Sequence, residues 1–152
     1  ISVSAFLLNR SSDLEILASG VKVAGVVVYK SGTSGYAVSL FNVGGSASSD
    51  GTQYTYPNRA SGLSSVTAVS GRSWIVGTSP QYAAAFNNNY ATFNSYITAA
   101  GGRAMGTLTY CCSDIATSNF PWFVYERGQL AYSSYMTSSN GTTARIRPMI
   151  AF

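Results

Sequence analysis

The sequence predicts an α+β domain, because one helical pattern stands between a predicted hairpin and a run of strand patterns. Two β-branched, apolar stretches at residues 21–29 and 35–43 flank a turn-rich loop. Apolar residues three and four positions apart indicate a helix over residues 80–100. Strand patterns then follow at residues 106–112, 121–126, 129–136 and 144–152, which predicts a C-terminal antiparallel sheet. The length of 152 residues is that of one domain.

The N-terminal stretch before this pattern is expected to be a connector. Residues 1–8 have the composition of a strand, and residues 11–20 predict a short helix that Ser11 or Ser12 would cap and Gly20 would end. The chain begins with Ile rather than Met, so we expect a processed product or a piece of a longer chain. We therefore assign residues 1–19 to an N-terminal strand and connector, and residues 20–152 to the folded domain.

The hairpin prediction depends on "KSGTSG", a loop of turn residues between the strands at 21–29 and 35–43. Residues 44–73 are rich in Gly, Ser, Asn and Thr, so we expect loops there, with one helical turn near residues 63–69. The run at residues 74–76 is expected to be a short buried segment.

The predicted helix has recognisable ends. Ser79 is the expected N-cap, Pro80 suits the first helical position, and Gly101 with Gly102 makes a C-cap. Three asparagines at 87–89 are poor helix formers, so they predict a kink or a break. One apolar stripe, which we interpret as core, contains Tyr82, Phe86, Tyr90, Phe93, Ile97 and Ala100.

Composition limits the classes of function. Charged residues are only 9% of the chain, against about 25% in an average soluble domain. Such a polar, uncharged surface is typical of extracellular proteins, fibres and binding modules. The net charge is +4, but the nine cations are scattered singly, which argues against a nucleic-acid interface. No apolar run approaches the ~20 residues of a membrane-spanning helix.

Catalytic and metal-binding patterns are weak. The chain has no histidine, which excludes Ser-His-Asp and Cys-His catalysis. Cys111 and Cys112 are adjacent, and a disulfide between neighbours is strained, so we expect two free thiols on opposite faces of one strand. Asp114 and Glu126 could form a carboxylate pair for hydrolysis, but no other residue supports it. We therefore predict no enzyme activity, no cofactor and no metal.

A Tyr/Ser-rich stretch at residues 122–134 predicts a binding face. Period-2 alternation places Trp122 and Val124 inward and Phe123, Tyr125 and Arg127 on the opposite face. After a turn at Arg127–Gly128, the same face would continue with Gln129, Ala131, Ser133 and Tyr135. Tyrosine offers a stiff contact of mixed polarity and serine adds adaptable hydrogen bonds, a combination that antibody paratopes use. An ordinary solvated sheet face is the alternative interpretation.

The order and spacing of five segments resemble a known family. They are "SWIVGTSPQ", "YITAAGG", "TYCCSD", "FPWFVYERGQL" and "ARIRPMIAF", and with the N-terminal hairpin they cover residues 20–152. Together they resemble C-type-lectin-like domains that act as variable proteins of diversity-generating retroelements, at phage tail-fibre tips and on bacterial surfaces. Two departures are Gly77, where the family usually has Pro, and Cys111–Cys112, where it has Trp-Ser.

The resemblance implies a C-type-lectin-like fold in which adenine-containing codons of the binding face are randomised. Residues 144–152 would form one final strand that holds the scaffold, with Arg145 and Arg147 bonded to loop carbonyls. The expected framework is Trp74, Tyr110, Trp122, Val124, Gly128, Leu130, Arg145, Arg147, Pro148 and Phe152. Resemblance and strand alternation together give a candidate face, called here the 112–135 face, of Cys112, Asp114, Ile115, Thr117, Asn119, Phe120, Phe123, Tyr125, Glu126, Arg127, Gln129, Ala131, Ser133, Ser134 and Tyr135.

The resemblance implies a receptor-binding domain for a host-surface protein or glycan, at the tip of a phage tail fibre or on a surface adhesin. The location would be the virion, the extracellular space or the bacterial cell surface, with a homotrimer formed through an upstream fibre. The sugar-binding tripeptides of calcium lectins are absent from the sequence, and a fold does not by itself imply function. The alternative is a structural fimbrial or fibre subunit without its own ligand.

Overall fold

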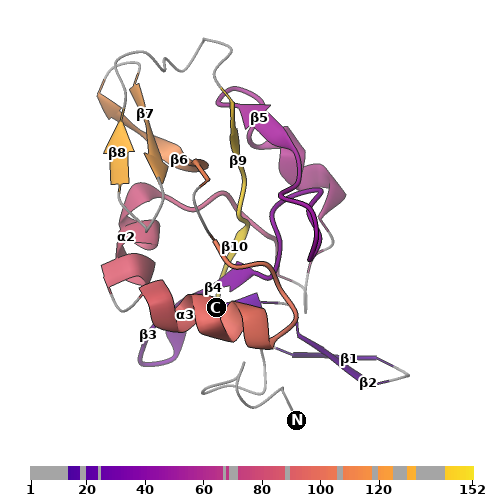
Figure 1. Cartoon of the computed structure of the whole chain (residues 1–152). Helices are drawn as coiled ribbons and strands as arrows, with labels where there is room; N and C mark the ends of the chain where they lie inside the picture. Colours follow the sequence, from indigo (N-terminus) through magenta and orange to yellow (C-terminus); the bar gives the residue numbers. More distant parts are fainter. Residues whose placement is uncertain are drawn as a thin grey trace.

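The computed structural model describes residues 14–17, 20–23, 25–66, 68, 72–87, 90–105, 108–117, 120–124, 130–132 and 143–152. Within them the chain forms two α-helices and sheets of two, three and five strands, so the α+β prediction is confirmed (Figure 1). None of the described helices is long and apolar enough to cross a membrane.

The first sheet is a hairpin of β1 (Leu14–Leu17) and β2 (Gly20–Val23). The helix predicted over residues 11–20 is therefore wrong for its described part. The register pairs Leu14 with Val23 and Ile16 with Val21, so apolar positions two apart match across the strands. Apolar residues alternate here with the period of two that a strand requires. This alternation predicts the local structure better than the possible N-cap at Ser11 or Ser12 does. Residues 1–8, predicted as a strand, lie outside the described residues.

The second sheet has the order β10-β4-β3, from β10 (Met149–Ala151), β4 (Ser34–Ser39) and β3 (Gly25–Ser31). β3 and β4 are antiparallel neighbours, which confirms the predicted hairpin. The strand expected over residues 21–29 is divided between β2 and β3, and the strand expected over residues 35–43 ends at Ser39. Gly32 has a φ of 58° in the turn, a left-handed conformation that glycine adopts without strain.

The helical region is split in two, as the asparagines predicted: α2 is Ser79–Asn87 and α3 is Tyr90–Ala99. The predicted N-cap at Ser79 is wrong by one residue. Thr78 Oγ1 accepts a bond from the Gln81 amide at 3.4 Å, and Gln81 Oε1 accepts one from the Thr78 amide at 2.8 Å. This reciprocal pair is a capping box, and the sequence T-x-x-Q would have revealed it.

The C-terminal end of α3 follows the prediction. Gly101 has a φ of 82°, and its amide donates to the Thr98 carbonyl at 3.0 Å. The Gly102 amide donates to the Ile97 carbonyl at 2.8 Å, which completes a Schellman motif.

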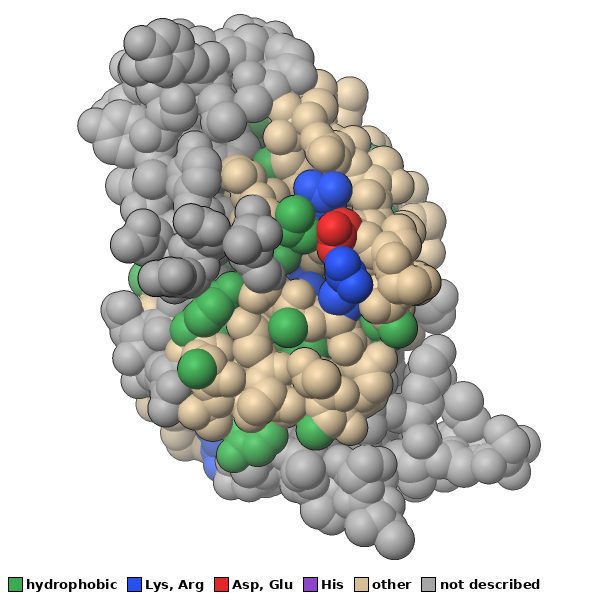
Figure 2. Space-filling model, viewed as in Figure 1, with side chains coloured by type: hydrophobic (Ala, Val, Ile, Leu, Met, Phe, Trp, Pro, Cys, Tyr) green, Lys and Arg blue, Asp and Glu red, His purple; other side chains and the backbone are tan. Residues whose placement is uncertain are grey.

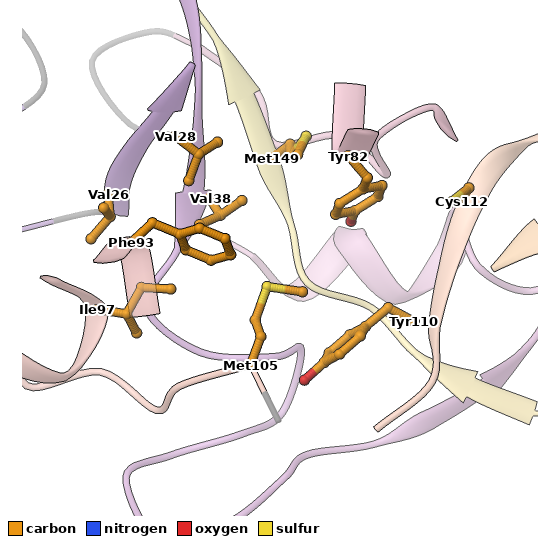
Figure 3. Close-up of a cluster of buried hydrophobic side chains, with 10 residues drawn as sticks. All are labelled: Val26, Val28, Val38, Tyr82, Phe93, Ile97, Met105, Tyr110, Cys112 and Met149. Atoms are coloured by element: carbon orange, nitrogen blue, oxygen red, sulfur yellow. The ribbon is translucent and has the colours of Figure 1, made fainter. Parts of the chain in front are cut away.

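The helices cover the main core. Phe93 and Ile97 of α3 pack with Val26, Val28 and Val38 of the second sheet (Figure 3). The rest of this cluster comes from other parts of the chain and contains Tyr82, Met105, Tyr110, Cys112 and Met149. Three residues of the predicted stripe, Tyr82, Phe93 and Ile97, are therefore core, and Tyr90 packs against them. Ala100 is only half-buried. In the run at residues 74–76, Trp74 and Val76 are buried but Ile75 is exposed, so that prediction holds only in part.

The third sheet has the order β5-β9-β6-β7-β8. Its strands are β5 (Gln53–Thr55), β9 (Thr143–Arg145), β6 (Tyr110–Thr117), β7 (Phe120–Val124) and β8 (Leu130–Tyr132). β5 was not predicted, β6 begins four residues later than expected, and the helical turn in the loop region is a 3-10 helix, η2 (Ser61–Ser65). β6 and β9 run parallel, so the sheet is mixed rather than wholly antiparallel.

The segment predicted as one final strand, residues 144–152, forms two. β9 lies inside the five-stranded sheet, and β10 lies at the edge of the three-stranded sheet (Figure 1). The break falls at residues 146–148, where Pro148 lacks the amide hydrogen that a continuous strand would need. The segment thus connects the two larger sheets.

Candidate functional site

Seven residues of the 112–135 face lie in β6, β7 and β8, which are sequential antiparallel neighbours at one end of the third sheet (Figure 1). Phe123 is paired with Ala131 of β8 and with Cys111 of β6, so the three residues form one row across the sheet. The register therefore makes Phe123 and Ala131 direct neighbours, in a row that also contains the buried Cys111.

For four of the predicted residues in β6, β7 and β8 the structure describes the backbone alone. They are Thr117, Phe120, Phe123 and Ala131. Ile115 is 45% exposed and is one of two large apolar side chains that are exposed among the described residues, the other being Ile75. Eight predicted positions lie outside the described residues: Asn119, Tyr125, Glu126, Arg127, Gln129, Ser133, Ser134 and Tyr135.

Cys112 does not belong to an exposed face. Its side chain is 0% exposed in the main core, whereas Cys111 packs in a second cluster with Val43, Val76 and Ile146. The two thiols are free and lie on opposite sides of β6, as predicted. Burial raises the pKa of Cys111 to about 12 and that of Cys112 further, so both stay protonated at neutral pH. Strand alternation, applied from Tyr110 on, would have placed Cys112 inside.

Asp114 is part of the scaffold. Its Oδ1 accepts a bond from the Ser79 amide at 2.6 Å, and its Oδ2 accepts one from the Ser79 hydroxyl. The carboxylate therefore binds the first residue of α2, where the helix dipole favours negative charge. Glu126, its proposed catalytic partner, lies outside the described residues. No described residues gather three His, Cys, Asp or Glu side chains at one place.

A second contact holds the same part of β6, and no pattern in the sequence predicts it. The Ser113 carbonyl accepts bonds from Tyr56 Oη at 3.0 Å and Arg59 Nη2 at 3.1 Å. The Arg59 guanidinium also lies 3.6 Å from the centre of the Tyr56 ring, which is a cation–π contact. Loop 56–59 and helix α2 thus fix β6 on two sides.

Gly77 fills a position that has no room for a side chain. Its carbonyl accepts a bond from the Ser113 amide at 2.8 Å. A Cβ at this position would lie 2.6 Å from Met149 Sδ and 2.9 Å from Tyr82 Cε2. The packing of these two core side chains therefore requires glycine at position 77.

The two C-terminal arginines bind loop carbonyls, as predicted. Arg145 Nε donates to the Asp50 carbonyl at 3.0 Å. Arg147 is 0% exposed and donates to the carbonyls of Ser39 (3.1 Å), Leu40 (2.7 Å) and Arg103 (2.7 Å).

The buried guanidinium of Arg147 has no carboxylate partner among the described residues. Burial lowers its pKa, while the nearby Tyr110 hydroxyl raises it. Three backbone carbonyls take the place of a carboxylate as hydrogen-bond acceptors. Through these bonds Arg147 connects β4, the segment after α3, and the break between β9 and β10.

Comparison of the sequence with protein-family models and with curated proteins gives no match.

Proposed function

We propose that the chain is a receptor-binding domain with a C-type-lectin-like fold, which binds a host-surface protein or glycan through the 112–135 face. Its place would be the tip of a phage tail fibre or a surface adhesin, in a trimer formed through upstream residues. The proposed chemistry is binding alone, without a cofactor or catalysis.

The observation that carries the proposal is a division between scaffold and candidate face. The described framework residues hold the fold: Trp74 and Tyr110 are buried, and Arg145 and Arg147 bind carbonyls of distant loops. The described parts of the Tyr/Ser-rich segment instead lie in β7 and β8, which form one end of a sheet. A stable scaffold that carries polar and aromatic residues at one end of a sheet is an arrangement that supports recognition.

The proposal separates the candidate residues by role. Ile115 is exposed beside Asp114, whose carboxylate is already bound to Ser79. We therefore assign Asp114 to the support of the face and remove Cys112 from it. The remaining candidates are those that the sequence pattern placed on the face.

The first test replaces Tyr125 and Arg127 with alanine together. Beads that carry many copies of the domain would be mixed with a panel of bacterial strains, since multivalency compensates for weak single sites. We expect the wild type to bind some strains and the double variant to lose them, because Tyr and Arg at interface centres each contribute about 2 kcal/mol or more.

The matched control is Tyr29→Ala with Lys30→Ala, which removes one tyrosine and one cation from β3. It should bind as the wild type does. Full binding by the Tyr125/Arg127 variant would place the ligand elsewhere. If no strain is bound and the double variant instead changes self-association, the structural-subunit alternative is correct.

The second test concerns diversification. Deep sequencing of the gene across a growing population of its source should find substitutions confined to codons 110–140 and located at adenines. An invariant sequence there would contradict a diversified face and favour an adhesin of fixed specificity.

A further inference from the structure

A pocket of about 350 Å³ lies between the loop before β5 and the turn that follows α3. Its lining includes Ala47, Asp50, Thr98, Arg103, Ala104 and Leu108. None of these residues belongs to the 112–135 face.

An ion pair forms the polar part of this pocket. Arg103 Nε donates to Asp50 Oδ1, and Arg103 Nη1 donates to the Ala47 carbonyl at 3.0 Å. Among the described residues, Asp50 Oδ2 accepts no hydrogen bond and Arg103 Nη2 donates none. The side chain of Asp50 is 33% exposed and that of Arg103 is 37% exposed, so a ligand can approach the ion pair. Figure 2 shows acidic and basic groups in contact on this face of the molecule.

The backbone under the ion pair is fixed from both sides. The Asp50 carbonyl accepts bonds from Asn42 Nδ2 at 2.8 Å and Arg145 Nε at 3.0 Å. The Arg103 amide donates to the Leu40 carbonyl at 3.0 Å, and its carbonyl accepts from Arg147 at 2.7 Å. The charged groups are therefore held before any ligand arrives, which lowers the entropic cost of binding.

We propose that this pocket is a subsite for a neutral saccharide, with two neighbouring hydroxyls bound by Asp50 and Arg103. One hydroxyl would donate to Asp50 Oδ2, and the next would accept from Arg103 Nη2. The ion pair stays intact in this arrangement, whereas an anion would compete with Asp50 and a cation with Arg103. Leu108 and Ala104 offer apolar contact to the C–H groups of the sugar ring.

The expected affinity is weak. The described lining residues include no aromatic side chain on which a sugar ring could stack. A single site should therefore bind in the millimolar range, and many copies together would be needed to hold a surface glycan. The subsite does not depend on the 112–135 face, so it goes beyond the function proposed above.

The test is an NMR titration of the ¹⁵N-labelled domain with the methyl glycosides of mannose, galactose and N-acetylglucosamine. At least one should shift the amide signals of Ala47, Arg103 and Ala104. Asp50→Asn should weaken that binding about tenfold or more, because hydrogen bonds to charged groups are the stronger ones. Ala104→Leu should weaken it by filling the mouth of the pocket without altering the ion pair.

The control variant Lys30→Gln removes an exposed cation on β3 and should bind like the wild type. The Tyr125/Arg127 double variant should also keep this binding, which separates failure of the subsite from failure of the face. No shift with any of the three glycosides would overturn the proposal, as would shifts that survive both pocket variants. A stronger response to the methyl glycoside of N-acetylneuraminate would overturn the neutral class of ligand.

Discussion

Arg147 is a fully buried charged residue that makes three long-range hydrogen bonds inside the scaffold. Its guanidinium connects three carbonyls from two distant segments inside the core. Such a group costs free energy to bury, and the carbonyls would be left without partners if it were removed.

We predict that Arg147→Met lowers the free energy of unfolding by about 3 kcal/mol or more, because each buried carbonyl without a partner costs about 1–3 kcal/mol. Arg145→Met, which breaks a single bond at a half-buried site, should cost about 1 kcal/mol. Urea unfolding of the two variants measures the difference. Equal losses would show that the three carbonyls find other partners.

At the scale of elements, the N-terminus of α2 has two independent supports. Thr78 and Gln81 form the capping box, and the Asp114 carboxylate reaches Ser79 from β6. The helix that covers the core is thereby joined to the strand that begins the candidate face.

We predict that Thr78→Ala costs about 1 kcal/mol of stability, the usual loss for an N-cap. Ser95→Ala is the matched control, since Ser95 is exposed within α3 and its hydroxyl only bonds back to the Thr92 carbonyl. Thermal melting of both variants would measure the effect. A Thr78→Ala variant as stable as the control would mean that Asp114 alone suffices to cap α2.

The elements that the sequence predicted well are those with a strong local pattern. The β3–β4 hairpin has two β-branched runs around a turn, and the split between α2 and α3 falls at the asparagines. Both follow from neighbours in the chain.

The elements that the sequence did not predict depend on distant partners. β5 is a strand because residues 53–55 pair with β9, about ninety residues further on. The separation of β9 and β10 places them in different sheets, since β9 pairs with β5 and β10 pairs with β4, and both partners are distant in the chain. In the candidate site, the role of Asp114 could not be predicted, because its partner Ser79 lies 35 residues away.

At the scale of the whole molecule, two cysteine thiols and two tyrosine hydroxyls are buried in their protonated form. Burial raises the pKa of Cys111 from 9.0 to about 12, and it also raises the pKa of Cys112, Tyr56 and Tyr82. Each group releases its proton more readily in the unfolded chain. The stability that this difference contributes is complete below the unfolded pKa and is lost as pH rises through the folded one.

We predict that the domain loses stability as pH rises above 9, the ordinary pKa of the cysteine thiol. Cys111→Ala should reduce the slope of stability against pH by up to about 1.4 kcal/mol per pH unit between 9 and about 12. Urea unfolding in a series of alkaline buffers gives both slopes. An unchanged slope in the variant would assign the alkaline loss to Cys112 and the tyrosines.

The division of residues 143–152 between two sheets also has a consequence for the timing of folding. β9 lies between β5 and β6, and β10 pairs with β4, so neither large sheet is complete until this segment has been synthesised. Pairing over such separations is slow, and until then the strand edges stay open to other chains. A chain that stops before residue 143 would therefore aggregate rather than fold, so only chains translated through β10 could present a folded candidate face.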